Sequence, residues 1–171
     1  MRKDDITPDD IIAMMEAGAQ AGVLQQHEHQ LLENVFDMES RTVTSAMTAR
    51  ESLIFFTLNE SQEVIKAKLA DHPHAKFLVV DGVLDKVVGY VDTRDILLQV
   101  LHNQPISLKK EGIVRAPLII PDTLSLYEVL EHFKSAGLDF AIIMNEYALV
   151  VGIITLKDVM SIVMGELVSS E

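Results

Sequence analysis

Three polar residues, Thr155, Lys157 and Asp158, follow directly on the apolar stretch 150–154. If that stretch is a strand that passes into a helix, Asp158 lies in the first helical turn, where backbone N–H groups are unpaired and partly positive. Such a helix start attracts phosphate, the threonine hydroxyl donates to a phosphate oxygen, and the lysine neutralises charge. The carboxylate accepts from both hydroxyls of a ribose. The three residues therefore suit a nucleotide that is bound without being transformed.

The phrase that carries these residues occurs twice. Residues 87–97 return as residues 150–160, with both valines, the glycine and the closing aspartate unchanged. That aspartate is Asp95 in the first copy and Asp158 in the second. A repeat of this kind predicts two similar units that pack on one another and share a cleft.

The first copy departs from the second at the position that should meet phosphate. Asp92 stands where the second copy has Thr155, and a carboxylate there repels a phosphate group. Arg94 corresponds to Lys157, so a basic side chain is kept. We therefore expect one competent nucleotide site, at the second repeat, and one weak or empty site at the first.

The same residues also have a purely structural interpretation. Threonine is a common helix N-cap, and an aspartate in the first turn stabilises a helix without any ligand. Lys157 and Arg94 also suit solvated surface positions. Helix capping therefore stays open as an alternative, and the duplication is what favours the nucleotide.

The elements that position these residues are repeated as well. Each copy of the phrase follows a lead-in strand, a helix and a short run of branched apolar residues that is typical of a strand. The pattern predicts an α/β (α+β) fold of two pseudo-symmetric repeats, each a small sheet with flanking helices. The lead-in strands span 53–56 and 118–120, the helices 63–69 and 128–134, and the apolar runs 77–82 and 141–146.

The segment ahead of the repeats is predicted to be helical. Thr7 and Pro8 supply a hydroxyl cap and a first-turn proline, and Gly22 interrupts the apolar pattern before a second helix over residues 27–39. We interpret this segment as a connector to an upstream domain that is absent here. The predicted organisation is a helical connector over 1–40, a first repeat over 41–104, a second repeat over 105–166 and a tail over 167–171.

The composition limits the classes of function. Of the 171 residues, 49% are hydrophobic, and the 14 basic and 26 acidic side chains give a formal charge of −12. An acidic surface repels phosphate backbones, so we expect no nucleic-acid partner. No apolar run approaches the roughly 18 residues of a membrane-spanning helix. The chain has no cysteine for disulfides or thiolate metal sites.

Neither metal binding nor catalysis is predicted. The pairs His27 and His29, and His72 and His74, lack the i, i+4 spacing of a helical zinc pair, and the spacing suggests no third ligand. No nucleophile motif or Walker-type phosphate loop occurs. We therefore expect no metal site, no catalytic cofactor and no enzymatic activity.

The repeated phrase, Gly-apolar-apolar-Thr-x-x-Asp in its second copy, resembles a tandem pair of cystathionine-β-synthase-type (CBS) domains, also called a Bateman module. The resemblance covers about residues 41–165. Several further stretches resemble more narrowly the CBS pair of the CorC/haemolysin-C-like membrane proteins. These stretches are residues 115–121, 145–147 and 152–158, together with the end of the helical lead-in at 31–36.

The family's binding positions carry over onto two sets of residues in this chain. In the stronger set, served by the second repeat, Ile153 would line an adenine pocket and residues of the first repeat would face it. This set comprises Thr155, Asp158, Ile153, Lys157, Leu53, Ile54, Ala75 and Lys76. The weaker, pseudo-symmetric set comprises Asp95, Tyr90, Arg94, Arg115, Pro117, Leu118 and Asp139.

The resemblance implies a regulatory module that binds AMP or ATP, alone or with Mg²⁺, in the cleft between the repeats. The phosphate count of the nucleotide stays open. Occupancy would be transmitted to the protein's own transmembrane domain, of a magnesium and cobalt efflux type, from the cytoplasmic face of the inner or plasma membrane. The family also implies a homodimer formed through the CBS helices. The alternative is a constitutive dimerisation or docking module whose cleft is vestigial.

Overall fold

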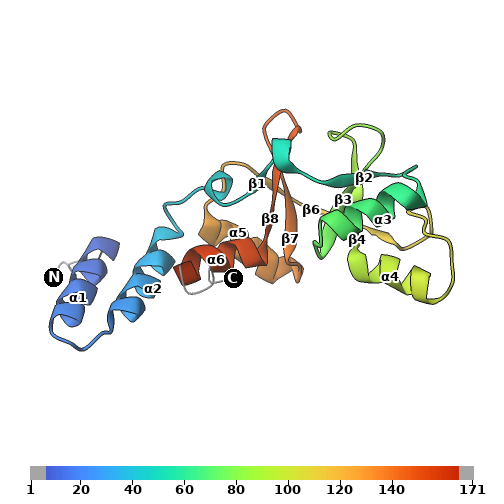
Figure 1. The fold of residues 1–171 in the computed structure, drawn as a ribbon. Helices are drawn as coiled ribbons and strands as arrows, with labels where there is room; N and C mark the ends of the chain where they lie inside the picture. Colours follow the sequence, from blue (N-terminus) through green and yellow to red (C-terminus); the bar gives the residue numbers. More distant parts are fainter. Residues whose placement is uncertain (1–6, 166–171) are drawn as a thin grey trace.

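The computed structural model describes residues 7–165 as two α/β lobes and a helical hairpin that projects to one side (Figure 1). Residues 1–6 and 166–171, which include the predicted tail, lie outside the described residues. The hairpin consists of α1 (Pro8–Gln20) and α2 (Gln26–Asp37) and forms the predicted helical connector. Within residues 7–165, none of the helices combines the length and the apolar character that crossing a bilayer requires.

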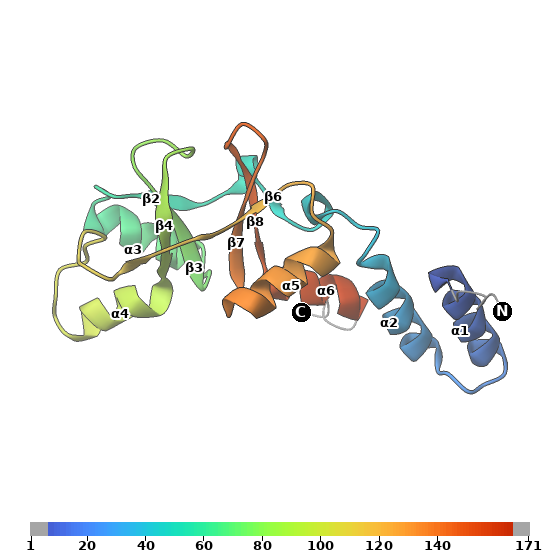
Figure 2. The ribbon, with the colours of Figure 1, turned by 180° about the vertical axis from the view of Figure 1, so that it is seen from behind.

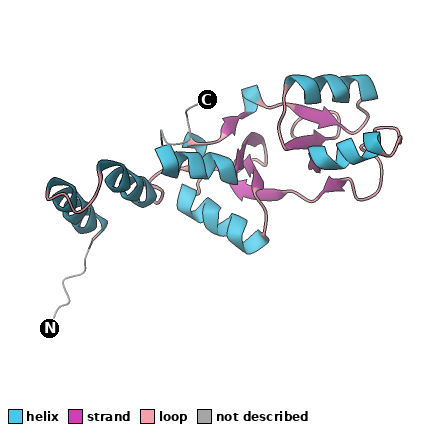
Figure 3. Cartoon of the chain, turned by 60° about the horizontal axis from the view of Figure 1, so that its bottom comes forward, coloured by secondary structure: helices cyan, strands magenta, loops and turns pink. Residues whose placement is uncertain are grey.

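The two lobes follow the two repeats. The first has the four-stranded sheet β2-β3-β4-β5, and the second has the four-stranded sheet β1-β8-β7-β6. Helices flank the strands in both lobes (Figure 3), which confirms the predicted fold class. The first lobe comprises β2 (Phe55–Thr57), α3 (Gln62–Asp71), β3 (Lys76–Val80), β4 (Val87–Asp92), α4 (Thr93–Leu101) and β5 (Val114–Arg115). The second comprises β1 (Thr48–Ala49), β6 (Leu118–Pro121), α5 (Leu126–Ala136), β7 (Phe140–Met144), β8 (Val150–Thr155) and α6 (Leu156–Met164).

One short strand of each sheet comes from outside its own repeat. The strand β1 lies near the start of the first repeat, yet it pairs antiparallel with β8 of the second, where Thr48 lies opposite Ile153. The strand β5 leads into the second repeat, yet it pairs antiparallel with β4 of the first, where Arg115 lies opposite Tyr90. The lobes are therefore joined by exchanged strands. The predicted lead-in strands pair within their own lobes as β2 and β6.

The glycine shared by both copies of the repeated phrase lets these exchanged strands approach. A Cβ atom on Gly152 would collide with the carbonyl oxygen of Thr48 and would lie 2.7 Å from Sδ of Met47. A Cβ atom on Gly89 would collide with the carbonyl oxygen of Arg115. Any side chain at either position would push the exchanged strand away. Backbone packing therefore explains why the repeat keeps this glycine.

A core shared by the two repeats holds the lobes together. Tyr90 of the first repeat packs on Phe140 of the second, with ring centroids 5.4 Å apart. Because both repeats contribute buried side chains to one cluster, the lobes form a single packed unit. The buried members of this cluster are Leu53, Leu78, Val80, Tyr90, Phe140, Ile142 and Val150.

The connector begins and turns as its sequence predicts. The Oγ1 atom of Thr7 accepts a hydrogen bond from the backbone N–H of Asp10 at 3.3 Å, which is the expected hydroxyl cap. Gly22 follows the end of α1 with a φ of 78°, a backbone conformation that favours glycine. The observed second helix, α2, starts one position before the predicted segment and ends at Asp37.

The connector rests on the second repeat (Figure 2). The side chain of Asn34 in α2 donates to the carbonyl oxygen of Val163 in α6 at 3.0 Å. Met38, just beyond α2, is buried in the core of the second lobe, and its carbonyl oxygen accepts from the N–H of Tyr127 at 3.2 Å. A displacement of α6 would therefore reach the connector directly.

Candidate functional site

A cleft between the lobes brings together residues that lie far apart in the sequence. Its volume is about 490 Å³, in the usual range of small-molecule pockets, roughly 300–1,000 Å³. All eight residues predicted for the stronger site line it: Leu53, Ile54, Ala75, Lys76, Ile153, Thr155, Lys157 and Asp158. The remaining lining residues are Thr48, Ser52, Pro73, His74, Asp139 and Phe140.

The start of α6 supplies the hydroxyl and the carboxylate of this cleft. Thr155 is the N-cap residue, and its Oγ1 accepts from the N–H of Asp158 at 3.1 Å. In return, Oδ2 of Asp158 accepts from the N–H of Thr155 at 2.9 Å. This capping box satisfies the helix start without a ligand, so the structural alternative is realised. Because a carboxylate has about four acceptor positions, Asp158 keeps capacity to accept further hydrogen bonds.

The cleft also combines an apolar wall with cationic groups. Leu53 is buried and Ile153 half-buried, so a flat aromatic ligand would meet apolar surface there. Lys157 is exposed at the rim. The Nζ atom of Lys76 lies 2.9 Å from Oδ1 of Asp139, whose side chain is 57% exposed. Because the Asp139 side of this ion pair faces solvent, a phosphate group could take the place of the Asp139 carboxylate beside the largely covered Lys76 side chain.

The residues predicted for the weaker site are more dispersed. Asp95 and Arg115 line a hollow of about 310 Å³ and pair with each other, with Nη2 of Arg115 donating to Oδ2 of Asp95 at 2.7 Å. This hydrogen bond raises the pKa of Arg115 above its ordinary value. Tyr90 is buried in the shared core, and Asp139 lines the first cleft.

The helix start of the first repeat is also occupied by its own side chains. Asp92 caps α4, and its Oδ1 accepts from the N–H of Arg94 at 2.9 Å. The Arg94 side chain is exposed, while Pro117 and Leu118 are half-buried. Where the second repeat offers a hydroxyl at the cap, the first therefore offers a carboxylate, as the sequence predicts.

The exchanged strands extend this difference. Ile153 pairs with Thr48 of β1, and at the corresponding place in the first repeat Tyr90 pairs with Arg115 of β5. Thr48 contributes a neutral hydroxyl to the first cleft. Arg115 instead contributes a cation that binds Asp95. Of the two carboxylates proposed to bind ribose, Asp95 of the first repeat thus has a cationic partner in the protein, whereas Asp158 of the second repeat has none among the ion pairs of residues 7–165.

A larger hollow lies elsewhere, between α2 and α6. Its volume is about 930 Å³, and its lining includes His27, Asn34 and Arg41. None of the residues predicted for either set lines it. It also lacks the capping hydroxyl and carboxylate of a helix start. We therefore take the cleft of about 490 Å³ between the lobes as the candidate site.

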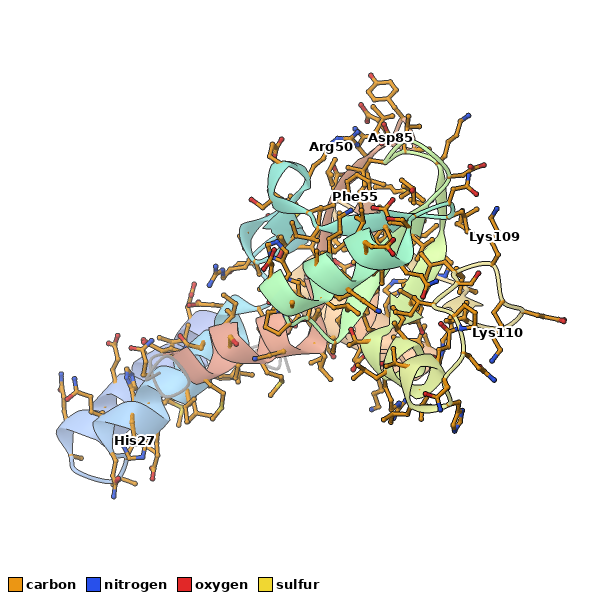
Figure 4. All side chains as sticks on the ribbon, turned by 45° about the vertical axis from the view of Figure 1, so that its right-hand side comes forward. His27, Arg50, Phe55, Asp85, Lys109 and Lys110 are labelled. Carbon is orange, nitrogen blue, oxygen red and sulfur yellow. The ribbon has the colours of Figure 1, made fainter. Side chains whose placement is uncertain are left out.

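A polar clasp between the lobes was not predicted from the sequence. The guanidinium of Arg50 donates to both carboxylate oxygens of Asp85, at 3.0 Å for Nη2 and Oδ2, and Nη1 also donates to the carbonyl oxygen of Val150 at 2.8 Å (Figure 4). The N–H of Val150 donates to Oδ1 of Asp85 at 3.0 Å. The hydrogen bonds from Arg50 and Val150 hold the pKa of Asp85 below its usual value, against a smaller opposing effect of burial.

The repeat, the exchanged strands and the inter-lobe cleft can now be compared with known proteins. Residues 111–165 match the CBS domain family. The predicted resemblance to CBS domains of the CorC type is confirmed by this match together with the solved structures and the relatives described next. The CBS domain of a bacterial CNNM/CorC family Mg²⁺ transporter matches with a TM-score of 0.82 over 94% of this chain and 98% of that one, at 19% identity.

Two structural neighbours of the CBS pair carry nucleotides. The CBS domain of the bacterial CNNM/CorC family Mg²⁺ transporter in complex with ATP has a TM-score of 0.71 at 20% identity, covering 81% of this chain and 97% of that one. A CBS-domain pair with bound AMP from Klebsiella pneumoniae has a TM-score of 0.62 at 19% identity, covering 73% of this chain and 99% of that one. At these identities the likeness establishes the shared fold.

Curated relatives are closer in sequence. The polyamine export protein of Salmonella typhimurium is 60% identical over 168 residues, which are 98% of this chain and 38% of that protein. The polyamine export protein of Haemophilus influenzae is 53% identical over 171 residues, which are 100% of this chain and 40% of that protein. The chain thus spans about two fifths of the length of these relatives.

Proposed function

We propose that this CBS pair is a non-catalytic regulatory module that binds an adenine nucleotide in the cleft between its lobes. The observation that carries the proposal is that one cleft is lined by a capping threonine, a first-turn aspartate, two lysines and an apolar wall. Solved structures of the same fold hold ATP and AMP. Adenine nucleotides are therefore the first ligands to test.

Each part of the nucleotide has a chemical counterpart in the cleft. The adenine ring packs against Ile153 and Leu53, and the ribose hydroxyls donate to Asp158. The phosphates lie near the Thr155 hydroxyl and the ammonium groups of Lys76 and Lys157. Lys76 exchanges its exposed partner Asp139 for phosphate. When several phosphates are present, Mg²⁺ accompanies them to neutralise their charge.

The helix α6 connects this cleft with the connector. It starts at the capping box and reaches Val163, whose carbonyl oxygen is held by Asn34 of α2. A nucleotide that favours one arrangement of the lobes would shift α6 and hence the connector hairpin. The shift is limited to the difference in affinity of the nucleotide for the two arrangements.

The remainder of the protein is proposed from its relatives. We infer that the connector leads to a transmembrane export domain and that the CBS pair lies at the cytoplasmic face of the inner or plasma membrane. The sequence resemblance implied magnesium and cobalt efflux. The polyamine export proteins are 60% and 53% identical, whereas the matching Mg²⁺ transporter structure is 19% identical. We therefore propose polyamines as the cargo.

Exposed apolar side chains support the proposed homodimer. On α4, Leu97 is 51% and Leu101 is 73% exposed, and on α6, Met160 is 42% exposed. Such side chains on adjacent repeats favour burial against a second copy. Dimerisation through the CBS helices accompanies either functional candidate.

Isothermal calorimetry tests the nucleotide proposal. The chain is titrated with AMP and with ATP, each with and without Mg²⁺. We expect saturable binding at about one site per chain and a loss of roughly 1.5–3 kcal/mol in Asp158→Ala, the range for hydrogen bonds to a charged group. The absence of heat at millimolar nucleotide, with a folded sample, would contradict the proposal.

The second candidate is a constitutive docking module with a vestigial cleft. The capping box favours it, because Thr155 and Asp158 already satisfy each other without a ligand. In that case Asp158→Ala would only remove its half of the capping box and lower the stability of α6. No nucleotide response would be present to lose.

A further inference from the structure

A polar cluster joins the two helices of the connector. Glu16 projects from α1, while His29 and Glu33 lie one turn apart on α2 and so share a helix face. One donor atom from each of the three, the imidazole nitrogen and two carboxylate oxygens, lies within 4.8 Å of the others. The Nε2 atom of His29 is 3.8 Å from Oε1 of Glu33. The hairpin therefore brings together three groups that commonly bind metal ions.

Two features of the cluster are unfavourable without a bound cation. The His29 side chain is only 16% exposed, and its Nε2 atom is buried without a hydrogen-bond partner among the described residues. A buried nitrogen in this state has lost its bonds to water without replacement. The carboxylates of Glu16 and Glu33 also face each other at close range, which is unfavourable for two negative charges. A cation between the three groups would relieve both.

We propose that Glu16, His29 and Glu33 form a binding site for a divalent transition-metal ion of the Zn²⁺ class. An imidazole with two carboxylates suits Zn²⁺ and its neighbours, whereas Mg²⁺ and Ca²⁺ prefer oxygen ligands alone. Three protein ligands leave a fourth position for water.

The geometry is close to what such an ion needs. Bonds of about 2.0–2.2 Å to Zn²⁺ place tetrahedral ligands roughly 3.4 Å apart. The separation of 3.8 Å between His29 and Glu33 is near this value. Glu16 is exposed, so its side chain is free to adopt the rotamer that closes the remaining distance. A bound ion would fasten α1 to α2, and α2 in turn contacts α6.

Competition with a fluorescent zinc chelator tests the site in the intact chain. We expect one Zn²⁺ per chain and at least about tenfold weaker binding in Glu16→Gln, Glu33→Gln and His29→Ala, since even second-shell changes weaken metal sites by roughly 10–100-fold. The matched control is His27→Ala on the same helix, exposed and outside the cluster (Figure 4). It should bind Zn²⁺ like the unchanged chain.

A second measurement separates the site from general effects on folding. Zn²⁺ should raise the midpoint of thermal unfolding of the unchanged chain and of His27→Ala, but not that of Glu16→Gln, whose exposed side chain is dispensable for packing. Equal Zn²⁺ affinity in the unchanged chain and Glu16→Gln would overturn the proposal. An equally large loss of Zn²⁺ affinity in His27→Ala would also overturn the proposal, because Zn²⁺ would then bind to exposed histidines of the surface and not to the cluster. Nucleotide binding should be the same in all variants, so the two proposals fail separately.

Discussion

The helix that starts at Thr155 and the helix that starts at Asp92 follow the same repeated phrase, yet they meet different surroundings. At α6, a threonine and an aspartate cap each other and face a cleft that holds two lysines. At α4, one aspartate caps the helix, and the next, Asp95, is bound by Arg115. The common plan thus yields one helix start with a hydroxyl cap that faces a cleft and one with a carboxylate cap beside a paired Asp95.

One source of the difference lies inside the repeated phrase, where Asp92 replaces Thr155, and a second lies outside it. The exchanged strands place Thr48 beside one helix start and Arg115 beside the other. Each repeat keeps its glycine because an exchanged strand packs closely on it. The segment that crosses from the other repeat gives each helix start a different neighbour, a hydroxyl beside one and a guanidinium beside the other.

The largest expected contrast is between Asp158→Ala and Asp95→Ala. The first removes the proposed ribose acceptor, so we expect nucleotide affinity to fall by roughly 1.5–3 kcal/mol, about 10- to 150-fold. The second removes a carboxylate that Arg115 already occupies, so nucleotide affinity should be unchanged. Calorimetry under identical conditions measures both. Equal losses in the two variants would show that the sites are equivalent and would break the comparison.

The second contrast concerns the two packing glycines. We expect Gly152→Ala and Gly89→Ala each to lower the free energy of unfolding by about 1–3 kcal/mol, because the new methyl group collides with an exchanged strand. Only Gly152→Ala displaces β1 and Thr48, so only this variant should also weaken nucleotide binding. Urea denaturation and calorimetry measure the two effects.

The control for both variants is Gly18→Ala in α1. A Cβ atom there meets only the flexible end of Leu24, at 3.4 Å, and alanine favours the helix. Its stability should be unchanged or higher. Loss of nucleotide binding in Gly89→Ala but not in Gly152→Ala would show that the nucleotide binds at the first repeat, contrary to the proposal.

A third change should open the closed site. The double variant Asp92→Thr with Arg115→Thr gives the first repeat the residues found at the corresponding places of the second. It removes the carboxylate that repels phosphate and frees Asp95 to accept from a ribose. We expect the calorimetric stoichiometry to rise from about one nucleotide per chain toward about two. A stoichiometry that stays at one would show that these two positions do not close the site.

Much of this architecture could be predicted because it is encoded locally. Helix caps, branched apolar runs and the duplicated phrase identify the helices and most strands. The family resemblance implied the residues that line the first cleft. The exchanged strands β1 and β5 could not be predicted, since each has two residues and pairs with a distant partner. Without them, the pairing of Arg115 with Asp95 and the role of the glycines stay hidden.

The missed polar groups share a similar physical cause. The groups that lie near His29 are a glutamate one turn away and Glu16 on the other helix, so spacing between histidines carries no signal for them. The partner of Arg50 lies in a hairpin loop, at Asp85, and a third group is a backbone carbonyl. Long-range polar pairs of this kind follow from the packed fold and have no periodic pattern in the sequence.

The smallest expected effect concerns the clasp between the lobes. Because Arg50 and the N–H of Val150 hold the pKa of Asp85 below that of an unfolded aspartate, about 3.9, the unfolded chain takes up this proton first as the pH falls. The contribution of the clasp to stability is therefore complete above the unfolded pKa and is lost as the pH falls through the lower folded pKa. Urea unfolding between about pH 5 and pH 2 measures it, within the window where paired aspartates titrate.

The comparison with Asp85→Asn isolates this contribution from other carboxylates. The difference in stability between the unchanged chain and Asp85→Asn should shrink as the pH falls, because both then carry a neutral group opposite Arg50. Asp81→Asn, at an exposed position of the same hairpin loop, is the matched control for the loss of one carboxylate. The stability difference between the unchanged chain and Asp85→Asn could instead be constant across this pH range. The clasp would then hold the lobes through its hydrogen-bond geometry, with no contribution from the charge of Asp85.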